Sequence, residues 1–521
     1  MTTENRVVVP TDDIAFHVEQ RGIDFVPPSD RWATPRNIGA MWAGSSLNVE
    51  YFIYGALLMG FGFSFWSAVV LIVVGNLSFF LLGIASLQGP EAGTTAFTIS
   101  RAPFGTRGAK LISFFNWLTQ LGFETEGLIL IVGAAVVLTQ MAGFHANSTI
   151  RVLFVLLATA IQAVLPYFGH ATMVKVLRSL IIPFALIFLA FAVFAANHFH
   201  AVAAAPFASG WQLWTAGLAF TIALSGLGWT ECGNDYTRYL PRDVAKRQVV
   251  GWIFLGTAVP EIVLMVIGAM SFTFLSGSTA WSQEGATVAW NGSNPFEAFQ
   301  HGPVPSWFLA LFLIVAIVQL FGINSLDLYS SGVSLQAMGL NLKRYQAVLL
   351  DSAIAGSLTL YATFQSTFSL YMKEFVGVII VWIAPWFGIF IVDWMLRKFK
   401  YSAQELQRSD RGGIYFAQGG VHWNAMVAFV VGLVLALSAF SKAPPPVSFP
   451  FHWMTPVSNH YGGTCATDLV HGSCQAGWYG GADFSIFFGV FGAAAIYAVL
   501  EFFMKTVKRQ TERQRELERQ S

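Results

Sequence analysis

Residues 43–48 of the chain read AGSSLN, which places one glycine and three polar residues inside an otherwise apolar segment. Residues 225–230 read SGLGWT and interrupt a second apolar segment in the same way. Backbone that leaves the helix at membrane depth is tolerated only where it is buried in protein or lines a cavity. The two interruptions therefore predict a pair of broken helices around a central chamber.

The composition indicates a membrane protein. Of the 521 residues, 55% are hydrophobic and only 11% are charged, whereas about 25% of residues are charged in a soluble globular chain. Apolar windows long enough to cross a bilayer, about 20 residues, recur along the chain, and residues 65–86 and 180–196 are the clearest. The alternating pattern of outer-membrane strands is absent from the sequence. We therefore predict an all-α, polytopic membrane protein.

We expect twelve membrane-spanning helices, at residues 38–62, 64–88, 109–141, 149–166, 174–197, 212–236, 250–275, 306–338, 345–365, 374–396, 423–440 and 484–504. With the amino terminus in the cytoplasm, only Arg151, Lys373 and Lys442 of the 29 Lys and Arg residues fall on the outer side. This distribution obeys the positive-inside rule. It predicts a multi-pass protein of the plasma (inner) membrane with both termini in the cytoplasm.

The two interrupted segments are the first and the sixth of these spans, so we expect two halves of five helices with opposite orientation. The alternative is that the glycines and serines only permit close packing of helices. The expected organisation is a cytoplasmic amino-terminal segment at 1–36, a core of two repeats at 37–400, accessory helices with a long external loop at 401–504, and a charged, solvated helical tail at 505–521.

The predicted external loop contains Cys465 and Cys474. An oxidising compartment would permit a disulfide there, but two free thiols are equally compatible with the sequence. The oligomeric state is also left open.

Polar residues share one face of the third predicted span. Gln120, Phe123, Glu124 and Gly127 have the spacing i, i+3, i+4, i+7, which places them on one side of a helix. Ionisable groups inside a membrane are costly, so each is a candidate for function. Glu126 points elsewhere, and we expect it to pair with another helix or to lie close to a polar cavity.

A second polar face is predicted in the eighth span, where Asn324, Asp327 and Ser331 align. A flat heteroaromatic solute requires rings to stack on and amides or carboxylates at its edge. Trp229 and Phe123 could supply the stacking surfaces, although ordinary helix packing is the alternative for each ring.

Further charged residues flank the two interruptions. Glu50 and Glu231 follow them directly, so each could anchor a broken helix instead of contacting a solute. Asp235, Arg238 and Arg242 lie towards the cytoplasmic end of the sixth span. A gate or a stabilising ion pair is the expected role of these three.

Several motifs resemble those of the purine-cytosine permeases in the nucleobase:cation symporter family 1. They are VEQRGID at 18–24, LQGP at 87–90, SRAPFG at 100–105, NWLTQ at 116–120, GW at 228–229, DYTRYLP at 235–241, Asn324, YS at 329–330, WIAPW at 382–386 and DW at 393–394. The motifs follow the family order over residues 18–400.

The resemblance implies the five-plus-five inverted-repeat, LeuT-like fold, with the substrate held between broken helices 1 and 6 and helices 3 and 8. Trp229 would stack on the base, Phe123 would replace a second aromatic, and Gln120 and Asn324 would bind the edge of the base. The predicted substrate site consists of Ser45, Ser46, Asn48, Gln120, Phe123, Gly228, Trp229, Thr230 and Asn324.

The coupling residues depart from the sodium-dependent pattern. Such relatives have small hydroxyl residues directly before the asparagine of helix 8, where this chain has Gly322 and Ile323. We therefore expect a proton, carried by Glu124 or Asp327, because the neutral form of a carboxyl group is favoured beside an apolar cavity.

These observations predict secondary active uptake of cytosine, a purine or a related heterocycle. Allantoin, hydantoin, thiamine or a pyridine vitamin are alternative substrates, and a membrane-embedded sensor or channel is an alternative activity. The sequence contains no HExxH, GxSxG or GxxxxGK[ST] motif, so we expect neither an enzyme nor a primary pump. The expected partners are the solute, a co-transported cation and the lipid bilayer, with no cofactor, metal or nucleic acid.

Overall fold

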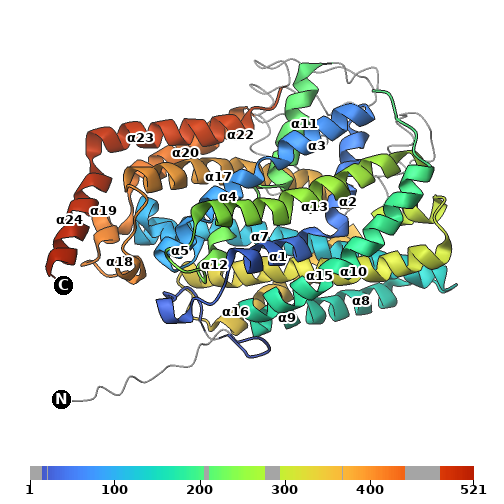
Figure 1. Cartoon of the computed structure of the whole chain (residues 1–521), viewed down its shortest axis with the longest axis horizontal. Helices are drawn as coiled ribbons and strands as arrows, with labels where there is room; N and C mark the ends of the chain where they lie inside the picture. Colours follow the sequence, from blue (N-terminus) through green and yellow to red (C-terminus); the bar gives the residue numbers. More distant parts are fainter. Residues whose placement is uncertain are drawn as a thin grey trace.

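The computed structural model describes residues 14–19, 21–204, 210–275, 294–365, 368–439 and 482–520. All regular structure in these ranges is helical, and most of the helices run along the long axis of the molecule (Figure 1). The first described residues and the last helix, α24 (Thr506–Gln520), lie at the same end of the bundle (Figure 1). We call this the terminal end.

The first half of the chain contributes α1 (Pro35–Ser46), α2 (Val49–Gly60), α3 (Phe65–Asn76), α4 (Phe79–Ala85), α7 (Arg101–Met141), α8 (Ser148–Gln162), α9 (Val164–Phe168) and α10 (His170–Asn197). Three short helices occur at the terminal end: η1 (Pro28–Asp30), α5 (Gln88–Ala92) and α6 (Ala96–Ile99).

The second half contributes α11 (Trp211–Leu224), α12 (Gly233–Thr237), α13 (Lys246–Leu275), α15 (Ser306–Ala337), α16 (Arg344–Gln365) and α17 (Phe368–Leu396). The remaining long elements are α20 (Trp423–Ser438), the π-helical turn η5 (Phe488–Gly492) between α22 (Ser485–Phe487) and α23 (Ala493–Met504), and α24. The short connecting helices are η2 (Pro295–His301), α18 (Ala403–Gln407), η3 (Ile414–Phe416) and α19 (Ala417–Gly420).

Each of the twelve predicted spans contains a helix. In the described part of the chain, eight helices are long and apolar enough to cross a membrane. The other four predicted spans contain the shorter apolar helices Val49–Gly60, Trp211–Leu224, Val381–Leu396 and Trp423–Ser438. The all-helical fold class is confirmed, while the number of membrane crossings stays a prediction.

Both predicted interruptions are real breaks. The first helix ends at Ser46, and Leu47 leaves the helical region with φ −78° and ψ 67° before α2 starts at Val49. The second break begins at Ser225, with φ −106° and ψ −131°, and continues as irregular turns until α12 starts at Gly233. Glycine and polar residues permit these conformations and supply local hydrogen bonds.

Glycines also allow very close helix packing, which was the alternative considered for the interrupted segments. The strongest case is the contact between α2 and α13. A Cβ atom at Gly55 would collide with the backbone of Met265, and one at Gly268 would collide with the backbone of Phe52. The two helix backbones can touch only because both positions lack a side chain. Breaks and glycine packing therefore occur together in this chain.

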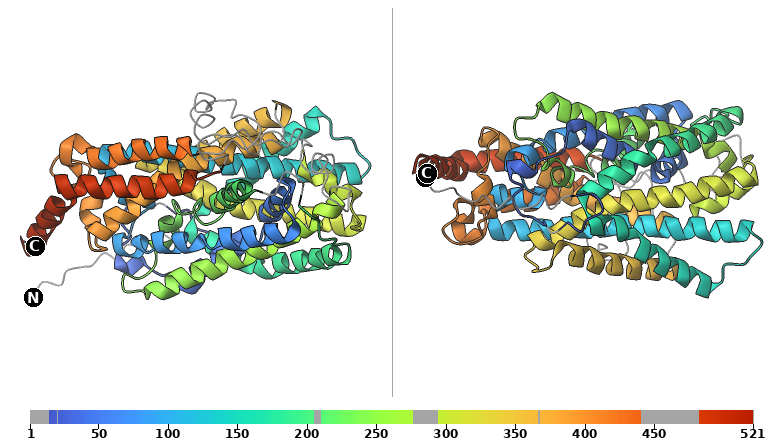
Figure 2. Two further views of the ribbon diagram at one scale, coloured as in Figure 1. Left: turned by 90° about the horizontal axis from the view of Figure 1, so that it is seen from above. Right: turned by 60° about the horizontal axis from the view of Figure 1, so that its bottom comes forward.

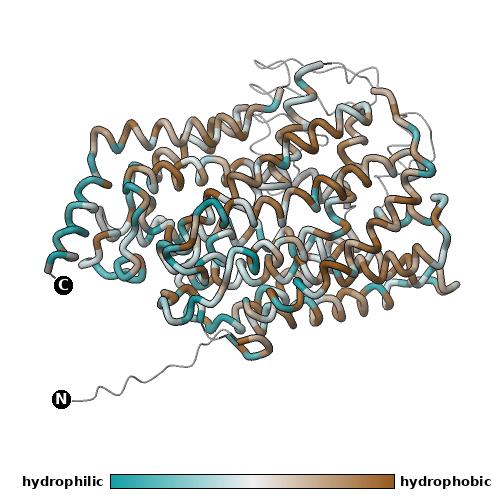
Figure 3. Tube along the Cα trace, viewed as in Figure 1, coloured by the Kyte–Doolittle hydropathy of each residue, from teal (hydrophilic) through white to brown (hydrophobic). Residues whose placement is uncertain are grey.

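The carboxyl-terminal tail is helical, as the sequence predicts, but it is not a straight extension of α23. Lys505 adopts left-handed backbone angles, φ 54° and ψ 33°, and accordingly α24 leaves the bundle at an angle (Figure 2). Figure 3 shows that α24 is hydrophilic along most of its length, in contrast to the apolar helices of the bundle. Cys465 and Cys474 lie outside the described residues, so their pairing stays open.

The α2–α13 contact generates a stability prediction. Gly268→Ala should lower the stability of the purified protein by about 1–3 kcal/mol, because the new methyl group overpacks against the backbone of Phe52. The matched control is Gly251→Ala on the same helix, where a Cβ atom would meet nothing within 4 Å. Thermal unfolding in detergent should show a lower midpoint for the first variant only. Equal midpoints for the two variants would contradict the packing argument.

Candidate functional site

The first break is held together by its own polar residues. Asn48 Oδ1 accepts a hydrogen bond from the Glu50 backbone N–H at 2.6 Å, which caps α2. Asn48 Nδ2 donates to the Ser45 carbonyl oxygen at 2.9 Å, and Ser45 Oγ donates to the Trp42 carbonyl oxygen at 2.9 Å. The side chains of Ser45 and Asn48 are therefore used by the backbone of the break itself.

Ser46 joins the first break to another long helix by a side-chain hydrogen bond. Its hydroxyl donates to Glu261 Oε1 on α13 at 3.3 Å. Glu261 is fully buried and was not singled out from the sequence. The signal was present, because Glu261 is an ionisable residue within a predicted span and thus met the criterion applied to Glu124.

The second break is fixed to the helices around it. The backbone N–H of Gly226 donates to Ser78 Oγ at 3.0 Å, and Thr230 Oγ1 donates to the Leu227 carbonyl oxygen at 2.7 Å. A Cβ atom at Gly228 would collide with the Ala223 carbonyl oxygen. Thr230 and Gly228 therefore maintain the irregular backbone of this segment, and Trp229 is the side chain that projects from it towards α7.

The rings of Trp229 and Phe123 lie face to face. Their centroids are 5.9 Å apart and their planes differ by 13°. Trp42 of α1 packs edge-on against Trp229 at 5.4 Å and fixes its orientation. A flat solute inserted between two parallel rings requires about 7 Å, twice a contact distance of about 3.5 Å. Because the two rings are already nearly parallel, moving them apart to this separation would make them a stacking site for one aromatic ring.

An amide group and a carboxyl group form a hydrogen bond near this ring pair. Gln120 Nε2 donates to Glu231 Oε1 at 2.9 Å, joining α7 to the second break. Gln120 Oε1 and Glu231 Oε2 are buried and have no hydrogen-bond partner among the described atoms. Buried polar atoms without partners are rare in native structures. These two atoms are therefore candidates for contact with the edge of a solute.

Asn324 on α15 contacts the same helix. Its Nδ2 atom donates to the Glu124 carbonyl oxygen and to Gln162 Oε1 on α8, both at 3.0 Å. Its Oδ1 atom accepts no hydrogen bond from the part of the chain that the structure describes. Gly127 leaves room for this amide group, because a Cβ atom at Gly127 would collide with the amide. The space beside Gly127, which was predicted to share this face of α7, is thus occupied by Asn324.

The remaining predicted residues are two buried carboxyl groups. Glu124 is fully buried and Asp327 is 2% exposed. Both oxygens of Glu124 and Oδ1 of Asp327 lack a donor among the described atoms. None of the ion pairs formed within the described ranges includes either group. Glu126 accepts a hydrogen bond from the Tyr54 hydroxyl of α2 at 2.7 Å, as expected for a pairing between helices, and it also lies near Asp327.

At the terminal end, the amino-terminal segment closes the space below the site. The fully buried carboxylate of Glu19 accepts a hydrogen bond from the Tyr329 hydroxyl at 3.1 Å and from the backbone N–H of His170 at 3.0 Å. It also lies 3.7 Å from Arg238 and 3.6 Å from Arg344. Glu19 therefore connects the end of α12 to α10, α15 and α16. This arrangement agrees with a gate or ion pair at Arg238.

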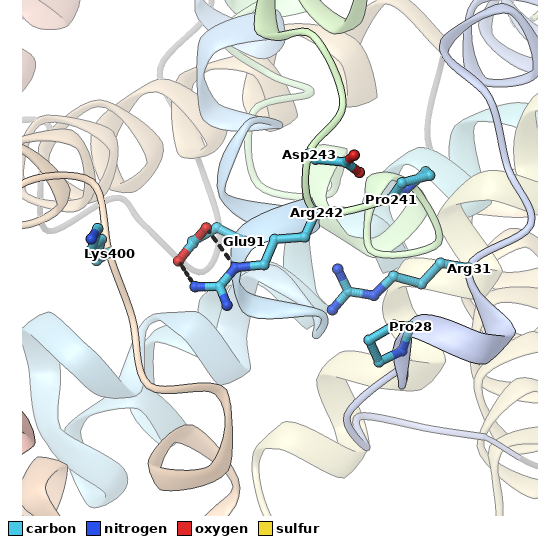
Figure 4. Close-up of a pocket in the computed structure, with 7 residues that line it drawn as sticks. All are labelled: Pro28, Arg31, Glu91, Pro241, Arg242, Asp243 and Lys400. Carbon is cyan, nitrogen blue, oxygen red and sulfur yellow. Dashed lines mark hydrogen bonds and ion pairs between the residues drawn. The ribbon is translucent and has the colours of Figure 1, made fainter. Parts of the chain in front are cut away.

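An open pocket lies at the same end (Figure 4). Its volume is about 610 Å³. It is lined by Pro28, Arg31, Glu91, Pro241, Arg242, Asp243 and Lys400. Arg242 bridges it by a bidentate pair with Glu91, at 2.5 and 3.1 Å. None of the predicted substrate residues lines it, so this charged pocket is a vestibule on the surface and not the predicted site.

Three comparisons with known proteins agree. Residues 25–462 match the profile described as "Permease for cytosine/purines, uracil, thiamine, allantoin". YxlA of Bacillus subtilis, provisionally named a purine-cytosine permease, is 26% identical over 437 residues, covering 81% of this chain and 88% of YxlA. The purine-cytosine permease FcyB of Emericella nidulans is 26% identical over 412 residues, covering 76% of this chain and 77% of FcyB.

Among solved structures, the chain is similar to Mhp1, a nucleobase-cation-symport-1 family transporter, in a closed conformation with bromovinylhydantoin bound. The TM-score is 0.65 with 17% sequence identity, and the match covers 96% of this chain and 98% of Mhp1. The inward-facing conformation of Mhp1 gives a TM-score of 0.64 with 16% identity, covering 93% of this chain and 96% of Mhp1. These similarities confirm the inverted-repeat fold with broken helices 1 and 6.

The closed terminal end generates a prediction about access. Glu19→Gln should open this end, because it removes the carboxylate that pairs with buried Arg238 and Arg344, and breaking a buried pair costs about 3–5 kcal/mol. The reporter is Cys232, which is fully buried at the end of the second break. Its labelling by a maleimide, followed by mass spectrometry, should accelerate about tenfold or more.

The labelling is measured with Cys465 and Cys474 replaced by serine, so that Cys232 is the only remaining thiol of the three. Asp30→Asn is the matched control, since Asp30 pairs with Arg21 in the same amino-terminal segment at 2.6 Å. Labelling at the unmodified rate in Glu19→Gln would refute the gating role of Glu19. An equal acceleration in both variants would attribute the effect to loosening of the whole segment.

Proposed function

The chain belongs to the family of permeases for cytosine, purines, uracil, thiamine and allantoin, and from this premise we propose that it takes up a nucleobase by secondary active transport coupled to a cation. Cytosine or a purine is the proposed substrate, and the proposed mechanism is alternating access around the two breaks. The parallel pair of Phe123 and Trp229 is the observation that supports the proposal most directly.

A nucleobase matches the chemistry of the proposed site. Its flat ring would lie between Trp229 and Phe123, and stacking of a base on an aromatic side chain contributes about 1–3 kcal/mol. Its edge carries N–H donors, and the unpartnered oxygens of Gln120, Asn324 and Glu231 can accept hydrogen bonds from them. Ser45, Ser46, Asn48, Gly228 and Thr230 complete the proposed site by shaping the two breaks.

The proposed coupling ion is a proton. Glu124 and Asp327 are buried carboxyl groups beside the site, and no lysine or arginine with a described side chain forms an ion pair with them. A carboxyl group in such a setting can bind a proton on one side of the membrane and release it on the other. The absence of hydroxyl side chains at Gly322 and Ile323 further favours a proton over sodium.

The proposed setting is the plasma (inner) membrane, with the terminal end in the cytoplasm. The distribution of lysine and arginine supports this orientation. Residues 37–400 would form the transport core, flanked by the amino-terminal segment at 1–36, and residues 401–504 would add the accessory helices. The charged tail at 505–521 would extend into the cytoplasm.

Other members of the substrate class provide the competing hypotheses. Allantoin, hydantoin, thiamine and a pyridine vitamin are also small rings with polar edges, and a sensor or channel would use the same binding site without coupling. Uptake of a labelled base, in competition with a panel of unlabelled rings and in cells without their own permeases, would separate the substrates. Accumulation against a gradient would exclude a channel or a sensor.

The stacking role of Trp229 can be tested by substitution. Trp229→Ala should lower uptake about 5- to 150-fold, the loss expected when about 1–3 kcal/mol of base stacking is removed. Trp229→Phe retains a ring, so its uptake should lie between that of this variant and that of the unmodified protein. Trp307→Ala is the control, since Trp307 is 70% exposed on the outer surface of α15. Unchanged uptake in Trp229→Ala at normal membrane expression would remove the stacking role.

The coupling ion can be identified by transport assays. Initial uptake should rise as the external pH falls, because protonation of a buried carboxyl group precedes each transport cycle. A protonophore should abolish accumulation, whereas replacement of sodium by potassium should leave it unchanged. The opposite pattern, with loss of accumulation only when sodium is removed, would show that the coupling ion is sodium.

A further inference from the structure

Asp351 on α16 is an acidic residue within the ninth predicted span, and the sequence analysis assigns it no role. In the structure, its carboxyl group faces that of Glu124 on α7. Asp351 Oδ1 accepts a hydrogen bond from Trp117 Nε1 at 2.7 Å. Trp117 precedes Glu124 by about two helical turns, so both side chains lie on the face of α7 that packs against α16. Asp351 and Glu124 are both fully buried.

The two carboxyl groups lack the donors that ionised oxygens require. Both oxygens of Glu124 and Oδ2 of Asp351 are buried and accept no hydrogen bond from a described donor. The hydroxyl of Ser331 on α15 is fully buried, points towards Glu124 and has no other partner. A buried carboxylate is stable only when it is hydrogen-bonded or paired. A proton held between Glu124 and Asp351 supplies the missing bond.

Among the side chains that the structure describes, none on the neighbouring helices forms a compensating ion pair with the carboxyl group of Glu124 or Asp351. From α15, Asp327 faces Glu124 and adds a third acidic group. From α8, the neutral amide of Gln162 bonds to Asn324, and α17 contributes the ring of Phe375 beside Phe123. Two carboxyl groups that face each other in a dry interior cannot both be ionised, so the pair retains at least one proton.

Both carboxyl groups are connected to the proposed substrate site through Asn324. Asn324 Nδ2 donates to the backbone carbonyl of Glu124 and to Gln162 Oε1, each at 3.0 Å. Gln162 Nε2 in turn donates to the hydroxyl of Ser352, the residue after Asp351, at 3.0 Å. A change in the separation of α7 and α16 must therefore move the amide that is proposed to bind the edge of the base.

We propose that Glu124 and Asp351 form a two-carboxyl proton site that carries the coupled proton, with Ser331 as a hydroxyl partner and Trp117 as the positioning residue of Asp351. The proposal rests on the proposed function of proton-coupled base uptake and adds Asp351 as its second coupling residue. In the empty state the pair holds one shared proton and one negative charge. In the loaded state it holds a second proton, taken from the outer medium, and is neutral.

The proton balance of the cycle follows directly. One proton from outside binds to a carboxylate oxygen of the pair as the base binds, and the same proton leaves to the cytoplasm after the base is released. No electron moves and no bond to the base forms or breaks. One positive charge therefore enters with each neutral base.

The test uses purified full-length protein in liposomes, with two assays for each variant. Glu124→Gln and Asp351→Asn should both lose accumulation driven by an inward proton gradient, so that the internal base falls to the external concentration. Both should still exchange internal labelled base for external base at a rate comparable with the unmodified protein, because exchange needs no net proton movement. Glu501→Gln, a buried carboxyl group on α23 bonded to Asn424 at 2.7 Å, is the matched control and should retain both activities.

The outcomes separate this inference from the proposed function. Gradient-driven accumulation by Asp351→Asn equal to that of the unmodified protein would refute the two-carboxyl site and leave base uptake standing. If the unmodified protein accumulates base only with sodium, the inference fails while base transport remains. If the unmodified protein neither exchanges nor accumulates any base, both the proposed function and the inference fail.

A second variant keeps the test decisive if Asp351→Asn is not recovered as folded protein. Trp117→Phe retains both carboxyl groups and removes only the indole N–H that stabilises the ionised form of Asp351. The midpoint of the pH profile of uptake should then move upward by about 0.5–1 pH unit, the shift expected from the loss of one hydrogen bond. A purely structural role of Trp117 would lower uptake at all pH values without moving the midpoint, and this result would overturn the proposal.

Discussion

A backbone inside a bilayer has no water to bond with, so every N–H and C=O group that leaves a helix needs a partner within the protein. The two breaks satisfy this constraint with short polar side chains. Asn48 caps α2 and bonds back to the Ser45 carbonyl, while Ser78 receives the N–H of Gly226. Since these bonds keep the chain irregular at mid-depth, the rest of the site depends on them. They allow Trp229 to reach Phe123 on a neighbouring helix.

The same constraint explains why polar groups gather in one part of the bundle. A buried polar atom is costly wherever it lies, and the cost is lower where several such atoms can bond with one another or with a solute. Gln120 bonds to Glu231, and Asn324 bonds to the backbone of α7. The oxygens left without donors at these residues mark the place where a solute edge and a proton would complete the network.

Closure at the terminal end relies on charge instead of stacking. Glu19 links helices from both halves of the chain, because His170 at the start of α10 belongs to the first half, whereas Arg238 at the end of α12 and Arg344 at the start of α16 belong to the second. Buried ion pairs contribute little net stability but are sensitive to the loss of one partner. Ion pairs of this kind suit a gate. They require specific partners when the end is closed, and water can hydrate the charged groups when the end opens.

The helical class, the positions of both breaks and the polar faces of α7 and α15 could be predicted from the amino-acid sequence, because these features follow from local periodicity and composition. Which residues are partners could be learned only from the folded chain. The pairing of Gln120 with Glu231 spans 111 positions and that of Trp117 with Asp351 spans 234. Helix packing, which no local pattern specifies, brings such residues together. Glu261 and Asp351 are visible in the sequence as polar residues within apolar spans. For the same reason, their partners could be identified only in the folded chain.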